Sequence, residues 1–375
     1  MTKLLFETSL KGHRIEYVHH IYLGMLEHPD DEFVIVVPEV FKEKRELYHW
    51  PDASHIRFVY MSEALKGCKE SGTLRQSFRR ALMLRKYVIE EKVDSVFLND
   101  LMAYIPAISL LIPHRVKVSG ILYNIYLYLW KNSSLKTRIL DIIKYLIMRF
   151  SPCIKAVFVL NDASSAAKLN KLYHTDKFKF ITDPYNAIDY SPRDVRKELG
   201  VSVDDKIFLH FGGLSVRKGT LDILRALALL PAYERKKCFF VFAGKIYEPI
   251  KAEFYGLLNN LSKDIRVRFY DQFCSNELLA DLCVSSDFIL MPYRNTAQSS
   301  GLLGHAAYYG TPVIGPKDGL IGKLIRKNHL GIQIDSISPA SIADAICKSV
   351  PFRLDTKYLD QVSIDQFKQE IFKLF

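Results

Sequence analysis

The chain has 375 residues, of which 49 % are hydrophobic and 25 % are charged, and its formal net charge is +11 at pH 7. This length and balance predict a globular protein with two domains, and no repeat or low-complexity segment competes with that interpretation. The positive charge would suit nucleic acid. However, the sequence contains no aromatic-interleaved RNA motif, zinc finger or recognition-helix pattern, so we expect no nucleic-acid partner.

We expect neither a secretory signal nor a membrane-spanning helix. The N-terminus has no long apolar segment, and the most apolar stretch of the chain, 118–130, falls short of the roughly 18–20 residues that a spanning helix needs. The six cysteines are scattered without metal-ligand spacing. They indicate buried free thiols in a reducing compartment. We therefore expect a cytoplasmic protein.

The first half of the chain alternates apolar strand patterns with helical patterns. Expected strands cover 3–7, 33–37, 56–60, 94–98, 116–123 and 155–160. This order is typical of a parallel sheet whose strands are connected by helices.

Residues 64–150 carry most of the excess positive charge, with 15 Lys and Arg against 6 Asp and Glu. Within them, residues 134–150 form a helical pattern that mixes isoleucines and leucines with Lys and Arg. Such a helix fits an anionic membrane surface, and it equally fits a core helix with a solvated basic face. Both interpretations stay open at this point.

A Pro-bearing linker over 181–197 precedes a second series of strands and helices. Expected strands cover 206–211, 239–243, 265–269, 287–291, 311–315 and 331–334. Expected helices cover 218–230, 248–262, 275–285, 301–309 and 339–349, and residues 363–375 form a final amphipathic helix. The sequence thus predicts an α/β protein with two Rossmann-like halves.

Doubly wound sheets bind ligands beyond the carboxyl ends of their strands. In the second half, the loops at that edge read FGGLSVRKG, AGKIYEP, YDQF and PYRNTAQSSG. Glycines let the backbone approach an anion, and Arg and Lys neutralise its charge. Candidate residues for a diphosphate site are therefore Gly212, Gly213, Arg217, Lys218, Gly244, Lys245, Arg294, Ser299, Ser300 and Gly301.

The last of these loops is the most informative, because Ser299, Ser300 and Gly301 open an apolar helix. The first amides of a helix form a ready anion site. An ordinary serine N-cap is the alternative interpretation of the same residues.

Several of these segments resemble the motifs of retaining, family-4-like glycosyltransferases with the GT-B fold. HFGGLSVRKGTLDILRAL resembles their GRLxxxKGxxxLIxA segment, and SSGLLGHAAYYGTPVIG resembles GxxLxEAxAxGxPVI. SSDFILMPYR and GLIGKLIRKNHLGIQID resemble two further segments, and the similarity covers most of residues 155–350 in the right order. Over residues 1–150 it is weak.

The resemblance implies two Rossmann-like domains that face each other across a cleft. We expect an N-terminal acceptor domain over 1–185, a C-terminal nucleotide-sugar domain over 186–355, and a C-terminal helix over 356–375 that returns to the first domain. Lys218 matches the lysine that holds the donor diphosphate, and the amides of Ser300 and Gly301 match the helix start that faces it. Arg217 stands beside Lys218 and is counted with it among the catalytic candidates.

The chain also departs from the family pattern at the donor site. Two glutamates that the family usually carries fall on Ala297 and His305, the arginine of GRL falls on Gly213, and a further glutamate falls on Lys323. His305 could hydrogen-bond a ribose hydroxyl in place of the second glutamate, or it could pack under the loop. These departures indicate either a reworked donor site or an inactive one.

In the first domain, the corresponding sheet-edge loops offer acceptor-side candidates. They are Gly12, His13, Asp100, Tyr123 and Asn124, with His13 as the catalytic candidate among them. The family often places a histidine where Tyr123 stands. Each of these residues could instead serve only the fold.

The sequence therefore predicts a hexosyltransferase-like glycosyltransferase that moves a sugar from a UDP- or GDP-linked donor to a glycan or lipid-linked acceptor. Such a reaction fits bacterial-type surface polysaccharide or glycolipid assembly at the inner face of the plasma membrane. No cofactor is expected beyond this co-substrate, and the sequence holds no D-x-D pair that would demand a metal. The alternatives are a GT-B nucleotide-sugar epimerase and a catalytically inactive GT-B partner subunit.

Overall fold

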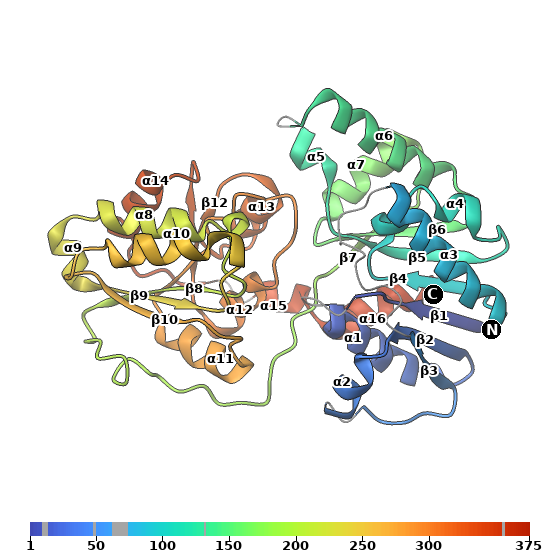
Figure 1. Cartoon of the computed structure of the whole chain (residues 1–375), viewed down its shortest axis with the longest axis horizontal. Helices are drawn as coiled ribbons and strands as arrows, with labels where there is room; N and C mark the ends of the chain where they lie inside the picture. Colours follow the sequence, from blue (N-terminus) through green and yellow to red (C-terminus); the bar gives the residue numbers. More distant parts are fainter. Residues whose placement is uncertain (10–13, 48–49, 62–73, 131–132, 355–356) are drawn as a thin grey trace. The chain divides into compact units, whose positions relative to one another are not determined.

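The computed structural model describes all residues except 10–13, 48–49, 62–73, 131–132 and 355–356. The chain divides into two compact units (Figure 1). Unit 1 contains Met1–Asp183 and Ile364–Phe375, and unit 2 contains Pro184–Ser363. The chain therefore enters unit 2 once and returns to unit 1 with its last residues.

Unit 1 is built on a seven-stranded sheet in the order β3-β2-β1-β4-β5-β6-β7, and every strand pair is parallel. The strands are β1 (Thr2–Phe6), β2 (Glu32–Pro38), β3 (Ile56–Met61), β4 (Ser95–Leu98), β5 (Lys117–Leu122), β6 (Ile154–Leu160) and β7 (Phe178–Ile181). The central strands consist almost wholly of buried apolar residues, as β2 shows with its run of five from Phe33 to Val37. Such strands are typical of a sheet covered by helices on both faces.

The helices of unit 1 connect these parallel strands (Figure 1). They are α1 (Arg14–Leu26), α2 (Phe41–Leu47), α3 (Leu74–Glu90), α4 (Ile108–Leu111), α5 (Tyr126–Leu129), α6 (Leu135–Phe150) and α7 (Ala163–Tyr173), with a 3-10 turn η1 (Leu101–Tyr104). Side chains fix two of their starts. Ser134 accepts a hydrogen bond from the Thr137 amide before α6, and Asp162 accepts one from the Ser165 amide before α7.

Unit 2 is built on a six-stranded parallel sheet in the order β10-β9-β8-β11-β12-β13. The strands are β8 (Lys206–Phe211), β9 (Cys238–Ala243), β10 (Arg266–Tyr270), β11 (Phe288–Leu290), β12 (Val313–Pro316) and β13 (Gly331–Ile334). Its helices are α8 (Thr220–Leu229), α9 (Ala232–Lys237), α10 (Glu248–Asn259), α11 (Asn276–Ser285), α12 (Leu302–Tyr309), α13 (Gly319–Lys327), α14 (Pro339–Cys347) and α15 (Lys357–Gln361), with a 3-10 turn η3 (Val216–Lys218). The last helix, α16 (Ile364–Phe372), belongs to unit 1 and packs on α1.

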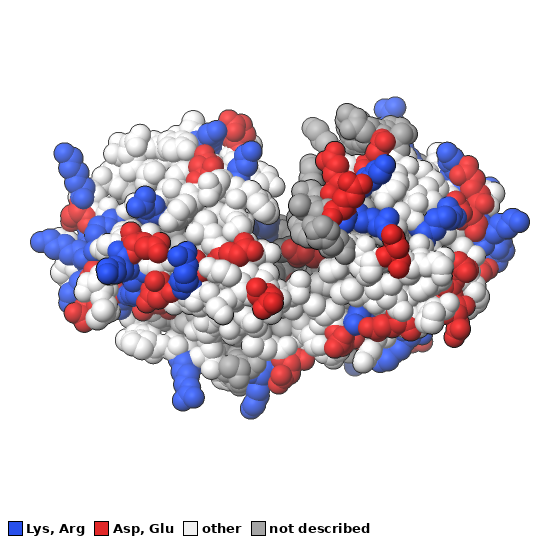
Figure 2. Space-filling view, turned by 90° about the horizontal axis from the view of Figure 1, so that it is seen from below, with Lys and Arg blue, Asp and Glu red and all other residues white. Residues whose placement is uncertain are grey.

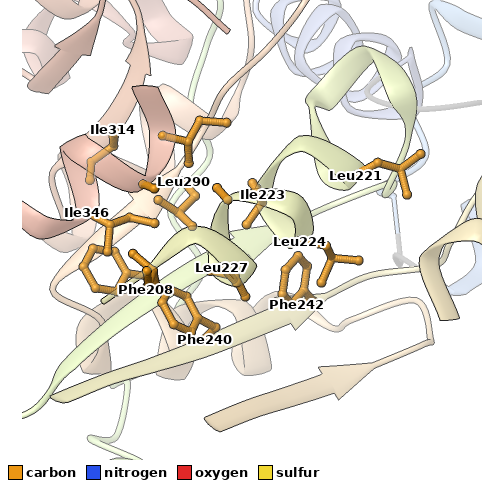
Figure 3. Packing of buried hydrophobic residues seen from close by; sticks show 14 of the residues in the cluster. Phe208, Leu221, Ile223, Leu224, Leu227, Phe240, Phe242, Leu290, Ile314 and Ile346 are labelled. Atoms are coloured by element: carbon orange, nitrogen blue, oxygen red, sulfur yellow. The ribbon is translucent and has the colours of Figure 1, made fainter. Parts of the chain in front are cut away.

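Aromatic side chains from neighbouring strands fill the core of unit 2 (Figure 3). The ring of Phe208 stacks on those of Phe240 and Phe288, with centroids 5.4 and 5.8 Å apart. Leu224 and Leu227 of α8 and Ile346 of α14 close the same cluster. Burying each such side chain contributes roughly 1.5–3 kcal/mol, so this core holds the strand ends of unit 2 in fixed positions.

The strand order reverses at β1/β4 in unit 1 and at β8/β11 in unit 2. Both sheets are therefore doubly wound, which confirms the predicted α/β class with two Rossmann-like halves. At each reversal, neighbouring connections leave the sheet toward opposite faces. The crevice that this creates beyond the carboxyl ends of the strands is where such sheets bind ligands.

The structure also corrects the sequence prediction in places. Residues 178–181 form the strand β7, which was not expected, and 232–237 and 319–327 form helices that were not expected. Five cysteines are free thiols, and Cys68 lies outside the described residues. Among the helices of the described residues, none has both the length and the apolar character to span a membrane.

Candidate functional site

Two glycine loops meet at the carboxyl edge of the second sheet. The Gly212 amide, just after β8, donates to the Ala243 carbonyl oxygen at 2.9 Å, at the end of β9. Gly244 has a φ of +144°, and a Cβ there would lie 2.0 Å from the carbonyl oxygen of Gly212. Only glycine permits this approach, so Gly212 and Gly244 draw the loops after β8 and β9 together. Gly213 and Lys245, the next residues of these loops, are exposed.

Lys218 and Arg217 project from the β8 loop around a single aromatic ring. The Lys218 Nζ donates to the carbonyl oxygen of Phe211 at 3.2 Å, and it lies 5.5 Å from the ring centroid of Tyr293. The Arg217 guanidinium lies 5.4 Å from the same centroid. No carboxylate of the described residues forms an ion pair with either cation. The loop therefore presents two charges that an anion could neutralise.

Arg294 lies beside these cations but is already engaged. Its guanidinium donates two hydrogen bonds of 2.6 and 2.7 Å to the buried carboxylate of Asp222, and its amide donates to the Arg217 carbonyl oxygen at 2.9 Å. These contacts tie the loop after β11 to α8 and to the β8 loop. The structure thus gives Arg294 a positioning role, and direct contact with a donor stays a prediction.

The start of α12 differs from the serine N-cap considered as the alternative. Gly301 is the N-cap residue, and as a glycine it has no side chain that could accept a hydrogen bond from the first amides of the helix. The Ser300 Oγ accepts only a long hydrogen bond of 3.4 Å, from the Leu302 amide. The helix therefore begins without a strong side-chain cap, which is the condition under which its first amides can receive an external anion. Ser299 directly precedes this turn.

The two positions that lack the expected glutamates lie in packed surroundings. Ala297 is fully buried, and its amide donates to the Asn295 Oδ1 at 3.1 Å. The ring of His305 contacts Tyr185 edge-on at 5.0 Å and Phe211 at 5.5 Å between centroids, and its Nδ1 lies 3.4 Å from the Tyr185 Oη. These contacts support packing under the loop for His305. A hydrogen bond to a ribose stays a prediction, as do the consequences of the half-buried Lys323.

His210 is a residue of this site that the sequence analysis missed. Its Nδ1 lies 2.8 Å from the Leu290 carbonyl oxygen, and its Nε2 lies 3.0 Å from the Thr220 Oγ1, which in turn accepts from the Ser215 amide. Burial lowers the pKa of His210 to about 3, so the ring is neutral near pH 7. Since a carbonyl oxygen can only accept, Nδ1 donates and Nε2 accepts. His210 thereby fixes the turn that carries Arg217 and Lys218.

In unit 1, two of the predicted acceptor-side residues come together and two lie outside the described residues. Asp100 and Tyr123 follow β4 and β5, and Asn124 is exposed beside them. Gly12 and His13 are the undescribed pair. Glu7 and Arg14 were not among the predicted site residues, although Glu7 directly follows β1 and the same sheet-edge rule applies to it.

These missed residues form a salt-bridged chain with Asp100. The Arg14 Nη1 lies 3.1 Å from the Glu7 Oε1, and its Nη2 lies 2.9 Å from the Asp100 Oδ2. Burial acts to lower the pKa of Arg14, but the two carboxylates outweigh it, and the pKa is raised overall. Burial raises the pKa of Glu7, although Arg14 opposes this. Arg14 thus stays charged, and its charge is matched within the protein.

A separate feature of unit 1 is the exposed face of α6. Only Tyr145 and Met148 of this helix are buried. Large apolar side chains are exposed along it, namely Leu135, Ile139, Leu140, Ile143, Leu146 and Phe150, with fractions from 39 to 72 %. This contradicts the interpretation of 134–150 as a core helix whose solvated face is the basic one. Residues 131–132 and the segment 64–73 of the wider basic region lie outside the described residues.

Comparison with known proteins agrees with this architecture. The fold is shared along nearly the whole chain with HepE from Anabaena, solved with UDP-glucose (TM-score 0.71, 16 % identity, 100 % of this chain and 98 % of that one). It is also shared with WaaG, a glycosyltransferase involved in lipopolysaccharide biosynthesis (TM-score 0.68, 15 % identity, 99 % of this chain and 98 % of that one). The chain therefore has the GT-B fold of these proteins, as the sequence predicted.

Within unit 2, residues 192–350 match the family described as Glycosyl transferases group 1. This stretch contains every candidate residue of the second sheet edge. Two curated relatives also match parts of the chain. N-acetyl-alpha-D-glucosaminyl L-malate synthase from Bacillus anthracis is 29 % identical over 50 % of this chain and 46 % of its own length. D-inositol 3-phosphate glycosyltransferase from Corynebacterium glutamicum is 28 % identical over 40 % of this chain and 36 % of its own length. The matches span less than half the length of these relatives.

Proposed function

We propose that the chain is a glycosyltransferase that moves a sugar from a nucleotide diphosphate sugar, UDP- or GDP-linked, to a glycan or lipid-linked acceptor. The observation that carries this proposal is the placement of Lys218 and Arg217 around Tyr293, between the glycine loop after β8 and the loop that leads from β11 to α12. The names of the two curated relatives and the UDP complexes of HepE support the choice of substrate class.

The residues of this edge suit the departure of a diphosphate. Charge builds up on the leaving phosphate in the transition state, and preorganised donors at that point lower the barrier. Lys218 and Arg217 would supply two cations, and the amides at the start of α12 would supply backbone donors. If Lys218 and Arg217 hold the leaving diphosphate, they would supply the positive charge that a metal ion could otherwise supply, so we propose a reaction that needs no metal and no cofactor.

A catalytically inactive partner subunit is the second candidate. It is favoured by the buried Ala297, which leaves no carboxylate at the position of the first expected glutamate. The inactive subunit would retain nucleotide binding through Lys218 but release no sugar. A nucleotide-sugar epimerase would instead act on the donor without an acceptor.

Replacement of one lysine tests the donor site. We expect UDP or GDP to raise the melting temperature of the wild type, and Lys218→Ala to weaken nucleotide binding about tenfold or more, as expected for a charge-assisted hydrogen bond. Lys263→Ala is the matched control, because this exposed lysine precedes β10 and so lies at the opposite edge of the sheet. If the wild type binds neither nucleotide, both enzyme functions fail. Binding without turnover of any nucleotide sugar would identify the inactive subunit.

We further propose that α6 rests on an anionic membrane surface, which places the protein at the inner face of the plasma membrane. On the face shown in Figure 2, charges of both signs are interspersed over each unit. The described residues of this face offer no broad basic patch for a membrane, so the proposal depends on the surface of a single helix, α6. Along α6, Leu135, Ile139, Ile143, Leu146 and Phe150 recur at helical spacing and are all exposed. The same helix also carries Lys136, Arg138 and Arg149. An apolar stripe flanked by cations is typical of helices that lie in the plane of a bilayer.

Vesicle flotation tests this surface. We expect the protein to float with phosphatidylglycerol-containing vesicles at low salt and to be released as salt rises, but not to bind phosphatidylcholine alone. The double variant Ile143→Ser/Leu146→Ser should reduce binding at least tenfold, because it removes apolar surface available for insertion. Leu229→Ser, on a leucine of α8 that is more exposed than either residue, should have no effect. Failure of the wild type to float would contradict the proposal.

A further inference from the structure

Tyr293 lies beside the two cations of the second sheet edge, and its side chain is wholly buried. It is 0 % exposed, yet it is not part of the core cluster around Phe208 and Phe240. Two charged groups lie over its ring: the Arg217 guanidinium is 5.4 Å from the centroid, and the Lys218 Nζ is 5.5 Å from it. One buried aromatic ring therefore contacts both cations of the candidate diphosphate site.

Two backbone contacts hold this ring beside the cations. The Arg294 amide, one residue after Tyr293, donates to the Arg217 carbonyl oxygen at 2.9 Å. One residue before Tyr293, Pro292 approaches Gly219 so closely that a Cβ at Gly219 would lie 2.2 Å from the Pro292 carbonyl oxygen. The two loops are thus joined on both sides of the ring, so the backbone sets the position of the ring relative to both cations.

Little else in the described part of the chain fixes these two side chains. No carboxylate there forms an ion pair with Arg217 or Lys218, and the Lys218 Nζ has one hydrogen bond of 3.2 Å, to the Phe211 carbonyl oxygen. Long basic side chains have many rotamers, and two neighbouring positive charges repel each other. Ordering both side chains before a ligand arrives lowers the entropic cost of binding it.

An aromatic ring can order a cation without neutralising it. The face of the ring attracts a cation within about 6 Å of its centroid. A carboxylate would order the cation too, but it would cancel the charge that a phosphate needs. Arg294 shows this second case, because both of its short side-chain hydrogen bonds go to Asp222. The Tyr293 ring instead keeps Lys218 and Arg217 available to an anion.

We propose that Tyr293 is a positioning residue of the donor site, whose ring holds Lys218 and Arg217 in place for the two phosphates of the nucleotide diphosphate sugar. Two cations that share one ring are fixed relative to each other, which suits a ligand with two adjacent charges. The hydroxyl has no part in this role, since the buried Tyr293 Oη has no hydrogen-bond partner among the described residues. This inference rests on the proposed glycosyl transfer and adds a residue that acts through the two cations.

Stepwise fluorination of the ring tests this role with little change in side-chain size. Phenylalanine and its mono-, di- and trifluorinated analogues are placed at position 293 of the full chain. Fluorine withdraws electron density from the ring face and so weakens its attraction for cations. We expect the Kd of UDP or GDP, whichever the wild type binds, to rise with each fluorine, by about three- to thirtyfold over the series. The Kd of the matching nucleoside should stay constant, because a nucleoside carries no phosphate.

Ordinary variants separate the ring from the hydroxyl. Tyr293→Phe should bind the nucleotide as tightly as the wild type and keep or raise the melting temperature, because it removes only an unpaired hydroxyl. Tyr293→Leu should weaken nucleotide binding about three- to thirtyfold, and by a smaller factor in the Lys218→Ala background, where one of the two cations is already absent. Phe254→Leu is the matched control at another fully buried aromatic residue of unit 2, and it should lower the melting temperature but leave the Kd unchanged.

The inference is overturned if nucleotide binding stays constant along the fluorinated series, if Tyr293→Phe weakens it as much as Tyr293→Leu, or if Tyr293→Leu has the same effect in both backgrounds. The fluorinated series decides the matter even when Tyr293→Leu fails to fold. Any of these results in a chain whose wild type binds UDP or GDP overturns only the role of Tyr293. A wild type that binds neither nucleotide overturns the proposed function itself.

Discussion

Whether a cation at a sheet edge can bind an anion depends on which groups already contact it. Arg14 contacts two carboxylates, and Arg294 contacts Asp222 twice. Lys218 and Arg217 instead face the ring of Tyr293. These four cations have similar positions in the fold, but they differ in the positive potential that they leave for a ligand. Of the four, Lys218 and Arg217 can offer their charge to an anion.

The Arg294–Asp222 pair is expected to stabilise unit 2. Arg294→Ala would leave the Asp222 carboxylate, which is 3 % exposed, without its two short hydrogen bonds. We expect a loss of about 1–3 kcal/mol in the free energy of unfolding, measured with urea. The Arg225 guanidinium lies 3.6 Å from the same carboxylate, and the Arg225 side chain is half-exposed. Arg225→Ala should therefore lower the free energy of unfolding by less than about 1 kcal/mol. Equal losses in the two variants would contradict this account.

The candidate residues show how far sequence could lead at this scale. The rule that loops at carboxyl strand ends carry chemistry points to Asp100, Tyr123 and Lys218, and the structure places each of them at such an edge. The sequence could not indicate which charges would pair inside the protein. Arg294 and Arg217 are both arginines in sheet-edge loops, and only the folded contacts separate them. His210 was missed because a strand histidine is read as an ordinary core residue until its two hydrogen bonds are seen.

Loops and helices of unit 2 depend on close backbone contacts. Gly219, between η3 and α8, has a φ of +71°, and a Cβ there would lie 2.2 Å from the carbonyl oxygen of Pro292. Together with the Arg294 amide bond to the Arg217 carbonyl, this contact presses the β11 loop onto the β8 loop. Gly219, which directly follows Lys218, therefore helps to set the distance between Lys218 and Tyr293 by letting the backbone approach Pro292.

Two glycines with the same φ separate backbone strain from this contact. Gly310, at the end of α12, also has a φ of +71°, but a Cβ there would meet nothing within 4 Å. We expect Gly310→Ala to cost roughly 1–2 kcal/mol through the left-handed conformation alone and to leave the binding of the nucleotide, UDP or GDP, intact. Gly219→Ala should cost about 1–3 kcal/mol more through overpacking, and it should also weaken the binding of that nucleotide. The two variants would be compared by urea unfolding and nucleotide titration, and identical behaviour would refute the role given to Gly219.

Element by element, the strands were more predictable than the surroundings of the helices. Runs such as Phe33–Val37 are apolar throughout, which only a doubly covered parallel strand requires. The strand β7 was missed because FKFI is short and its middle residues are half-buried at the sheet edge. For α6 the helical period was correct, but periodicity cannot tell an apolar face that packs inward from one that meets solvent. The exposed Ile143 and Phe150 had to come from the structure.

At the scale of the whole molecule, the two units are interrupted differently in the sequence. Unit 2 is one continuous stretch, whereas unit 1 is completed by Ile364–Phe375. From this last segment, Phe367 and Ile371 are fully buried and Phe375 is 5 % exposed, all in the core around β1 and β2. Phe372 packs so closely on α1 that a Cβ at Gly24 would lie 2.4 Å from its ring. The core of unit 1 is therefore complete only when residues 364–375 pack into it.

Removal of residues 364–375 should consequently destabilise unit 1 and spare unit 2. Each of the three buried side chains contributes roughly 1.5–3 kcal/mol, so the total loss is comparable with the stability of about 5–15 kcal/mol that a domain usually has. Hydrogen exchange should accelerate in β1, β2 and α1 and stay slow in β8 and β9. Phe367→Ala should give the same pattern with a loss of about 3–5 kcal/mol, and Lys373→Ala, on an exposed side chain, should give none. Uniform acceleration in both units would show that they unfold together, and would refute the independence of unit 2 from this segment.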